Sequence, residues 1–188
     1  MALFTKELGI DLGTINTRVA QGSQIVLQEP TVAAIVVQEQ KMVSWGQEAQ
    51  DMLGRVPESL EVTRPLRHGV IADYEVTEFM LEAILKRVSG SLRFFGPTVM
   101  VTVPFGVTSV ESRAVHEATL QAGARDAYLI QQPLAAAIGV DLPIGTPSGN
   151  MTLSLGGGAT QAAVLAMYGI VAAETLRRGG TALDEAIV

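Results

Sequence analysis

Residues 153–161 read LSLGGGATQ, an apolar run that enters a loop of three consecutive glycines. Leu153–Leu155 are typical of the end of a strand, and Ala159 begins a second strand-like run. Glycine has no Cβ atom, so such a loop lets the backbone close on a phosphate group. The strand end, where a metal-binding carboxylate is expected, carries Ser154. Three interpretations are open: a nucleotide site, the remnant of one, or a tight turn.

A similar pattern of strand, glycine loop and strand occurs near the N-terminus. Residues 10–13 (IDLG) align with residues 153–156 (LSLG), and Thr17 aligns with Thr160. Asp11 therefore holds in the first copy the position that Ser154 holds in the second. An internal repeat of this kind predicts two similar lobes that face each other and grip a phosphate between them.

The two glycine loops supply most of the candidate ligands. In the first copy these are Gly13 and the backbone N–H groups of Thr14, Ile15 and Asn16. In the second copy they are Gly156, Gly157 and Gly158. Asp11 at the strand end is a candidate for holding Mg²⁺ through water. A plain β-hairpin turn is the alternative, but ordinary turns rarely need three glycines, which favours an anion-binding site.

Composition limits the classes of function. The chain has 188 residues, which suits one ordinary domain or two small lobes. Its net charge is −6 and no basic run stands out, which argues against nucleic-acid binding. It has no cysteine, which excludes disulfides and thiolate metal sites and permits an intracellular location. No apolar run reaches the roughly 18 residues of a membrane-spanning helix, and the N-terminus has no signal-peptide core.

Hydrophobic periodicity predicts an α/β protein. We expect strands at 7–12, 17–22 and 97–104, further β-rich sequence over 24–40, a buried strand at 127–130, and three strand-like runs over 151–177. The strand at 97–104 lacks polar alternation, as in a strand covered on both faces. Helices are expected at 76–90, after a capping box of Thr108 and Glu111, and at 131–139. Residues 141–150 are rich in Gly and Pro and are the best candidate for a flexible linker.

Several segments together resemble the MreB family of bacterial actin-like cytoskeletal proteins, over almost all of the chain. They include LGIDLGTINT (8–17), RPLRHGVIADYEVTE (64–78), VTVPFGVTSVESRAV (101–115) and AGARDAYLIQQPLAAAIG (122–139), together with the chain from residue 147 onward. The resemblance implies a ribonuclease-H-like actin fold duplicated in two lobes. Residues 1–140 would form the first lobe, with a small insertion at about 38–75. Residues 141–150 would be the linker, and 151–188 the first β-meander and helix start of a shortened second lobe.

The resemblance also implies that ATP and Mg²⁺ bind between the lobes, but the sequence departs from the family pattern there. Family members carry DIGGGTTE where this chain has SLGGGATQ, so Ser154 replaces a metal carboxylate, Ala159 a hydroxyl and Gln161 an acid. Gln132 falls at the place of the water-positioning residue. Family chains are also nearly twice as long. We therefore expect weak or no ATP binding and hydrolysis, and we expect that Ser154→Asp alone does not restore turnover.

The stretch SLRFFGP (91–97) carries the membrane prediction. Leu92, Phe94 and Phe95 occupy a place that resembles the apolar membrane-insertion loop of the family. Alternatively, one or two of these side chains pack under the preceding helix. The membrane interpretation predicts a cytoplasmic protein attached peripherally to the inner membrane face.

The leading functional hypothesis is a structural one. We expect the chain to self-associate into a homodimer or filament through residues 151–188, because a meander with a bare apolar face exposes more apolar surface than monomers usually do. One alternative is an active Mg-ATPase that is a fragment of a longer MreB-like protein. Another is a regulatory partner that caps or copolymerises with a longer actin homologue.

Overall fold

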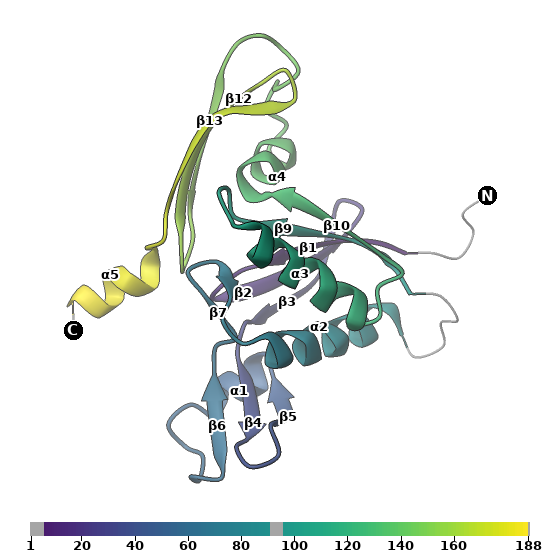
Figure 1. Ribbon diagram of the computed structural model, residues 1–188, viewed down its shortest axis with the longest axis vertical. Coiled ribbons are helices and arrows are strands. Elements are labelled where there is room, and N and C mark those ends of the chain that lie inside the picture. The colour runs from purple at the N-terminus through teal and green to yellow at the C-terminus, as the bar shows by residue number, and fades with distance from the viewer. Residues whose placement is uncertain (1–5, 91–95, 188) are drawn as a thin grey trace.

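The computed structural model describes residues 6–90 and 96–187 (Figure 1). The strands of the first half are β1 (Glu7–Leu12), β2 (Asn16–Gln21), β3 (Gln24–Pro30), β4 (Ala33–Val36), β5 (Lys41–Trp45), β6 (Leu60–Thr63), β7 (Leu66–Arg67) and β8 (Val70–Ile71). The later strands are β9 (Thr98–Val103), β10 (Asp126–Gln131), β11 (Asn150–Leu155), β12 (Thr160–Ala166) and β13 (Gly169–Leu176). The helices are α1 (Gln47–Asp51), α2 (Tyr74–Ser89), α3 (Ser109–Gln121), α4 (Gln132–Gly139) and α5 (Gly180–Ile187).

The largest sheet has five strands in the order β10-β9-β1-β2-β3. Strands β10, β9 and β1 run parallel, whereas β1, β2 and β3 form an antiparallel meander. Parallel neighbours need crossover connections, and α2 and α3 lie in those connections. This order brings the carboxyl ends of β1, β9 and β10 to one edge of the sheet, where their next residues can share a site.

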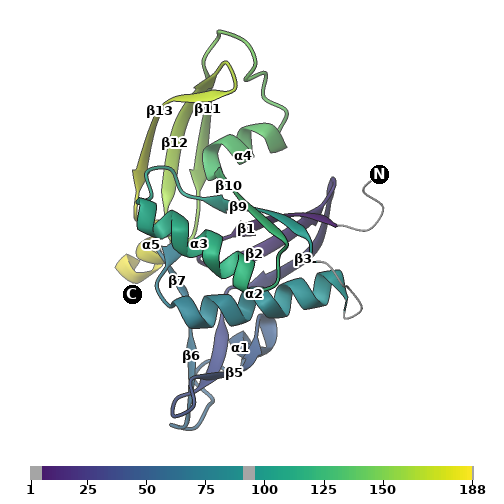
Figure 2. The ribbon, with the colours of Figure 1, turned by 45° about the vertical axis from the view of Figure 1, so that its right-hand side comes forward.

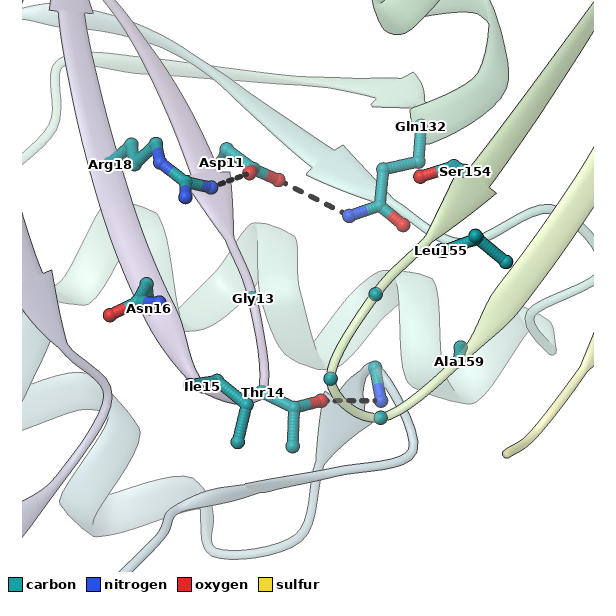
Figure 3. Close-up of a pocket in the computed structure, with 14 residues that line it drawn as sticks. Asp11, Gly13, Thr14, Ile15, Asn16, Arg18, Gln132, Ser154, Leu155 and Ala159 are labelled. Atoms are coloured by element: carbon teal, nitrogen blue, oxygen red, sulfur yellow. Dashed lines mark hydrogen bonds and ion pairs between the residues drawn. The ribbon is translucent and has the colours of Figure 1, made fainter. Parts of the chain in front are cut away.

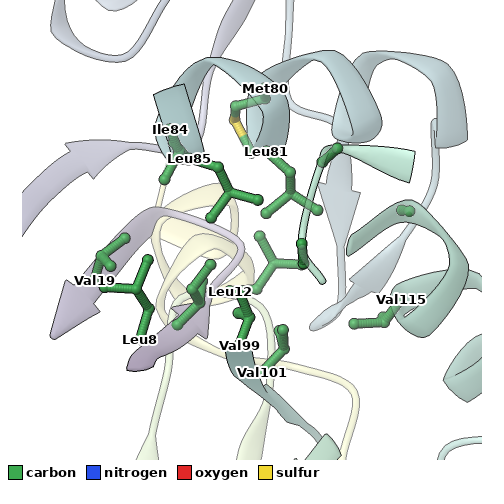
Figure 4. Close-up of a cluster of buried hydrophobic side chains, with 14 of the residues drawn as sticks. Leu8, Leu12, Val19, Met80, Leu81, Ile84, Leu85, Val99, Val101 and Val115 are labelled. Carbon is green, nitrogen blue, oxygen red and sulfur yellow. The ribbon is translucent and has the colours of Figure 1, made fainter. Parts of the chain in front are cut away.

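The main core lies between this sheet and the helices α2 and α3 (Figure 4). Alternate residues of β1 and β9 point to the same face, so Leu8 and Ile10 are buried with Val99 and Val101. On α2, buried residues recur at helical spacing: Met80, Leu81, Ile84 and Leu85. Asp73 caps this helix by accepting a hydrogen bond from the N–H of Val76. The capping box predicted for Thr108 and Glu111 is confirmed at the start of α3.

A small sheet in the order β5-β4-β6 extends from the first lobe. This small sheet packs against α1, and the contact is a separate cluster of buried residues: Val32, Ala34 and Ala49. A second cluster joins Ala33 and Ile35 of β4 to Val76 of α2. The small sheet is therefore anchored to the same helix that covers the main core.

The three strand-like runs predicted over 151–177 form one antiparallel sheet in the order β11-β12-β13. Helix α4 lies between this sheet and β10 (Figure 2). Ala137 of α4, Ala163 and Leu165 of β12, and Ile144 form the cluster that joins them. Ile144 belongs to the stretch that we expected to be a flexible linker, and its side chain is buried against the sheet.

The opposite face of this sheet is open to solvent. Met151, Leu153 and Leu155 alternate along β11 and are exposed, as are Val171 and Leu176 of β13. Helix α5 follows this sheet and has no buried residue among those described. The sheet β11-β12-β13 therefore presents a large apolar surface.

Two details of the strand predictions are wrong. Residues 98–103 form the expected strand, but Met100 is 45% exposed, so β9 is not covered on both faces. The strand at 126–131 lies at the edge of its sheet, and Tyr128 is exposed rather than buried. The physical reason is that α2 and α3 cover one face of the sheet, whereas the short helix α4 covers only part of the other.

Candidate functional site

A pocket of about 350 Å³ lies where the β1–β2 and β11–β12 hairpins face each other (Figure 3). All nine nucleotide-site residues predicted from the sequence line it: Asp11, Gly13, Thr14, Ile15, Asn16, Gln132, Gly156, Gly157 and Gly158. Ser154 and Ala159, singled out as departures from the family pattern, also line it. The internal repeat thus places both glycine loops on one pocket, as expected.

The two hairpins have the same geometry. Leu12 pairs with Thr17 in the first, and Leu155 pairs with Thr160 in the second. A Cβ atom added to Gly13 would lie 2.6 Å from the carbonyl oxygen three residues later, and one added to Gly156 would lie 2.8 Å from its equivalent. Any other residue at either position would have to distort the turn. The sequence repeat is therefore also a structural repeat.

The loops of the two hairpins touch each other. A Cβ atom at Gly157 would clash with the side chain of Ile15, and one at Gly158 would clash with the side chain of Thr14. Thr14 is also held from the side, because its Oγ1 accepts a hydrogen bond of 2.9 Å from the N–H of Gly69. Glycines in the second loop thus let the two lobes meet closely at one end of the pocket.

Asp11 is the carboxylate of the pocket, and three groups surround it. Its Oδ1 accepts hydrogen bonds from Oγ1 of Thr102 at 2.9 Å and from Nε2 of Gln132 at 3.2 Å. Nη1 of Arg18 lies 3.5 Å from its Oδ2. Register explains this last contact, because Asp11 and Arg18 are directly paired across the β1–β2 hairpin.

Gln132 is joined to the second lobe as well as to Asp11. It is the first residue of α4, and Pro133 follows it in the first turn. Its Oε1 accepts a hydrogen bond from Nε2 of Gln161 on β12, and Oε1 of Gln161 accepts one of 2.8 Å from the N–H of Phe105. Gln161 is only 2% exposed. A continuous chain of hydrogen bonds therefore crosses from Asp11 to the loop after β9.

Two further contacts hold β13 against the first lobe. Oγ1 of Thr175 donates a hydrogen bond of 2.8 Å to the carbonyl oxygen of Phe105. Beyond it, Arg177 and Glu111 form an ion pair with contacts of 2.9 and 3.2 Å. Hydrogen bonds from Arg177, and then from Thr108, lower the pKa of Glu111 from 4.5 to about 2. These contacts fix one lobe relative to the other beside the pocket.

The residues of the pocket fit a phosphate better than they fit Mg²⁺. Among the described residues, Asp11 is the one carboxylate that lines it, and its Oδ2 faces the guanidinium group of Arg18. Within residues 6–90 and 96–187 there is no group of three His, Cys, Asp or Glu side chains placed to hold a metal ion. Magnesium is usually bound through one or two carboxylates together with waters and phosphate oxygens, and Arg18 competes for the carboxylate of Asp11. The two glycine loops, by contrast, line the pocket mainly with backbone, which suits an anion.

Three pocket residues, Arg18, Gly69 and Leu155, were not predicted as site residues. The pairing of a hairpin centred on residues 13–16 places Arg18 opposite Asp11, so a register argument would have found it. Gly69 has no such local signal, because it reaches Thr14 across the fold. The predicted membrane residues Leu92, Phe94 and Phe95 lie outside the described residues. Among the helices that are described, none is long and apolar enough to cross a bilayer.

Comparison with known proteins gives close matches. The family model described as MreB/Mbl protein matches residues 5–188. The cell shape-determining protein MreB of Pasteurella multocida is 46% identical over 99% of this chain and 55% of its own length. Among solved structures, MreB5 of Spiroplasma citri bound to ADP is 28% identical with a TM-score of 0.87, covering 97% of this chain and 55% of that one. The same protein bound to AMPPNP gives the same values.

A more distant structure supports the fold alone. The MamK double helical filament has a TM-score of 0.76 at 22% identity, over 95% of this chain and 56% of that one. The predicted α/β actin-like fold is thereby confirmed. The chain spans about half the length of the relatives it matches. With a family model that matches nearly every residue and relatives at more than 40% identity, the chain belongs to the MreB/Mbl family.

Proposed function

We propose that the pocket between the two hairpins binds the phosphate groups of ATP or ADP. The observation that carries this proposal is the close approach of two equivalent glycine loops around a single carboxylate, Asp11. Such loops present backbone N–H groups to an anion without side chains in the way. The complexes of MreB5 with ADP and AMPPNP support a nucleotide rather than another phosphate compound.

The proposed role of this chain is that of an actin-like cytoskeletal protein in a cell-shape system. Its relatives are named cell shape-determining proteins, and MamK forms a double helical filament. In this proposal the chain self-associates through residues 151–188, where Met151, Leu153 and Leu155 form an exposed apolar row. It acts at the cytoplasmic face of the inner membrane, to which Leu92, Phe94 and Phe95 attach it.

Nucleotide binding is tested by isothermal titration calorimetry of the 188-residue chain with ATP and with ADP. Ser154→Phe fills the pocket from the end of β11, and Ser148→Phe places the same ring on the exposed segment before that strand. We expect saturable binding by the natural chain and by Ser148→Phe, and a loss of at least tenfold in affinity for Ser154→Phe. Equal affinities of the two variants, or no saturable binding by the natural chain, would refute the proposal.

A further inference from the structure

In the part of the chain that the structure describes, Arg18 is the one cationic side chain that lines the pocket. It extends from β2 toward Asp11 on β1 (Figure 3). Its Nε donates a hydrogen bond of 3.2 Å to Oε1 of Gln28 on β3, which orients the guanidinium group. Within the described residues, Nη2 of Arg18 makes no hydrogen bond to the protein, so this nitrogen keeps donors for a ligand.

The ion pair with Asp11 does not explain why an arginine is present. The two side chains are 43% and 37% exposed, and their closest contact is 3.5 Å. Long contacts between exposed groups contribute little to folding stability. Arg18 lies on the face of β2 opposite the core, so packing does not require it either. The guanidinium group of Arg18 is therefore not committed to the fold and is available to a ligand in the pocket.

The second hairpin carries no charged pair at the equivalent place. The pair equivalent to Asp11 and Arg18 is Ser154 and Gln161, and both are neutral. A pocket with two facing carboxylates would repel a polyphosphate unless a divalent cation lay between them. Within the described part of the chain, this pocket holds one carboxylate, and the guanidinium group of Arg18 lies 3.5 Å from it. The electrostatic need for a metal ion is therefore much reduced.

We propose that Arg18 binds the nucleotide phosphates and supplies the positive charge that a divalent cation otherwise would, so that this chain binds nucleotide without Mg²⁺. Guanidinium groups bind phosphate oxygens through two parallel hydrogen bonds, which makes arginine well suited to the task. The inference rests on the proposed nucleotide function. It assigns to Arg18 the ability of this chain to bind the nucleotide when no metal ion is present.

The test is calorimetric titration of the chain with ATP, once in excess EDTA and once in excess Mg²⁺. We expect the natural chain to bind in EDTA with an affinity within about threefold of that in Mg²⁺. Arg18→Gln should weaken binding in EDTA at least tenfold, the usual range for a lost charge-assisted hydrogen bond. Arg18→Lys should lose less, because it keeps the charge. Arg113→Gln, on the exposed face of α3, is the matched control and should bind like the natural chain.

A second variant, which leaves Arg18 unchanged, tests the same proposal without any effect of an Arg18 substitution on folding. Ser154→Asp adds a second carboxylate opposite Asp11. It should weaken ATP binding in EDTA by tenfold or more, and Mg²⁺ should restore most of the loss. Circular dichroism and thermal melting of each variant would show that the fold is retained.

The outcomes separate this inference from the proposed function. Binding of ATP by the natural chain in Mg²⁺ but not in EDTA would leave the nucleotide function standing and overturn the role of Arg18. Equal affinities of Arg18→Gln and Arg113→Gln in EDTA would overturn it as well. Absence of binding under both conditions would overturn the inference together with the function on which it rests.

Discussion

Gln161 on β12 donates a hydrogen bond from its buried side-chain amide to Oε1 of Gln132 at the start of α4. The same amide accepts a hydrogen bond from the N–H of Phe105, so it joins three segments of the chain. Gln132 in turn donates to Asp11. The position of the candidate water-orienting residue is therefore set by a side chain of the opposite lobe.

Replacing Gln161 should destabilise the protein. Gln161→Leu keeps the size of the side chain but leaves the N–H of Phe105 and Oε1 of Gln132 without partners. Both groups are partly buried, and leaving them unsatisfied should cost up to about 1–3 kcal/mol. For a chain of this size each 1 kcal/mol lowers the melting temperature by roughly 2–4 °C. Thermal melting by circular dichroism measures this. The exposed Gln38→Leu is the control, and equal melting temperatures for the two variants would contradict the prediction.

ATP turnover should be barely measurable. Gln132 donates to Asp11 and accepts from Gln161, so both ends of its amide are engaged, and Ser154 supplies no second carboxylate. Ser154→Asp should leave turnover low, because it does not release Gln132. Phosphate release is measured by a coupled assay against heat-inactivated protein. Release well above that background, abolished by Asp11→Ala, would show that the engaged Gln132 still supports hydrolysis.

Acid should weaken the contact between α3 and the end of β13. The pKa of Glu111 falls to about 2 because Arg177 and Thr108 donate hydrogen bonds to its carboxylate. A lowered pKa contributes stability above pH 4.5 that is lost as the pH falls toward 2. Arg177→Gln should therefore cost roughly 0.5–1 kcal/mol at pH 7, a value limited by solvent exposure, and progressively less below pH 4.5.

Urea unfolding at pH 7, 5, 4 and 3 measures this difference. Arg178→Gln, the adjacent exposed arginine, is the control and should show no such pH dependence. A difference between the natural chain and Arg177→Gln that stays constant down to pH 3 would rule out the ion pair as its source.

Self-association should depend on the apolar row of β11. Leu153 is 61% exposed between Met151 and Leu155, and burying such a side chain contributes about 1.5–3 kcal/mol per copy. The natural chain should show a mass above 19.8 kDa that increases with concentration, and Leu153→Lys should reduce it. Leu53→Lys, which changes a leucine 48% exposed in the first lobe, should not. A constant mass of one chain in multi-angle light scattering at micromolar concentration would exclude the interface.

Membrane attachment should depend on Phe94 and Phe95, a prediction that rests on the sequence alone. The double change of both residues to Ser should reduce co-sedimentation with vesicles of phosphatidylglycerol and phosphatidylethanolamine. Leu92, Phe94 and Phe95 would contribute ~1.5–3 kcal/mol each, so binding to the vesicles should be reversible. Because weak binding is far from saturation at low lipid concentration, the loss of two side chains should be clear there. Val110→Ser, an exposed apolar residue of α3, is the control. Unchanged sedimentation of the double variant, with its fold intact, would assign these side chains to another role.

Local interactions are the part of this protein that the sequence by itself determined. The capping box of Thr108 and Glu111 forms between residues three apart, and each glycine hairpin closes within a few residues of Gly13 or Gly156. Because these contacts are short in sequence, residue type and spacing suffice to predict them. The repeat indicated that the residues of the two glycine loops would share a pocket, the family resemblance added Gln132, and all nine residues line it.

Contacts between distant segments were decided only by the tertiary structure. Gly69 reaches Thr14 across 55 residues, and Gln161 reaches Gln132 across 29, through pairings that no local pattern encodes. The exposure of Met100 likewise depends on how far α4 extends over the sheet. A strand's own residues specify its alternation, but the elements that pack on each face decide which side is covered. The polar network around Asp11 therefore exists because the fold brings two lobes together.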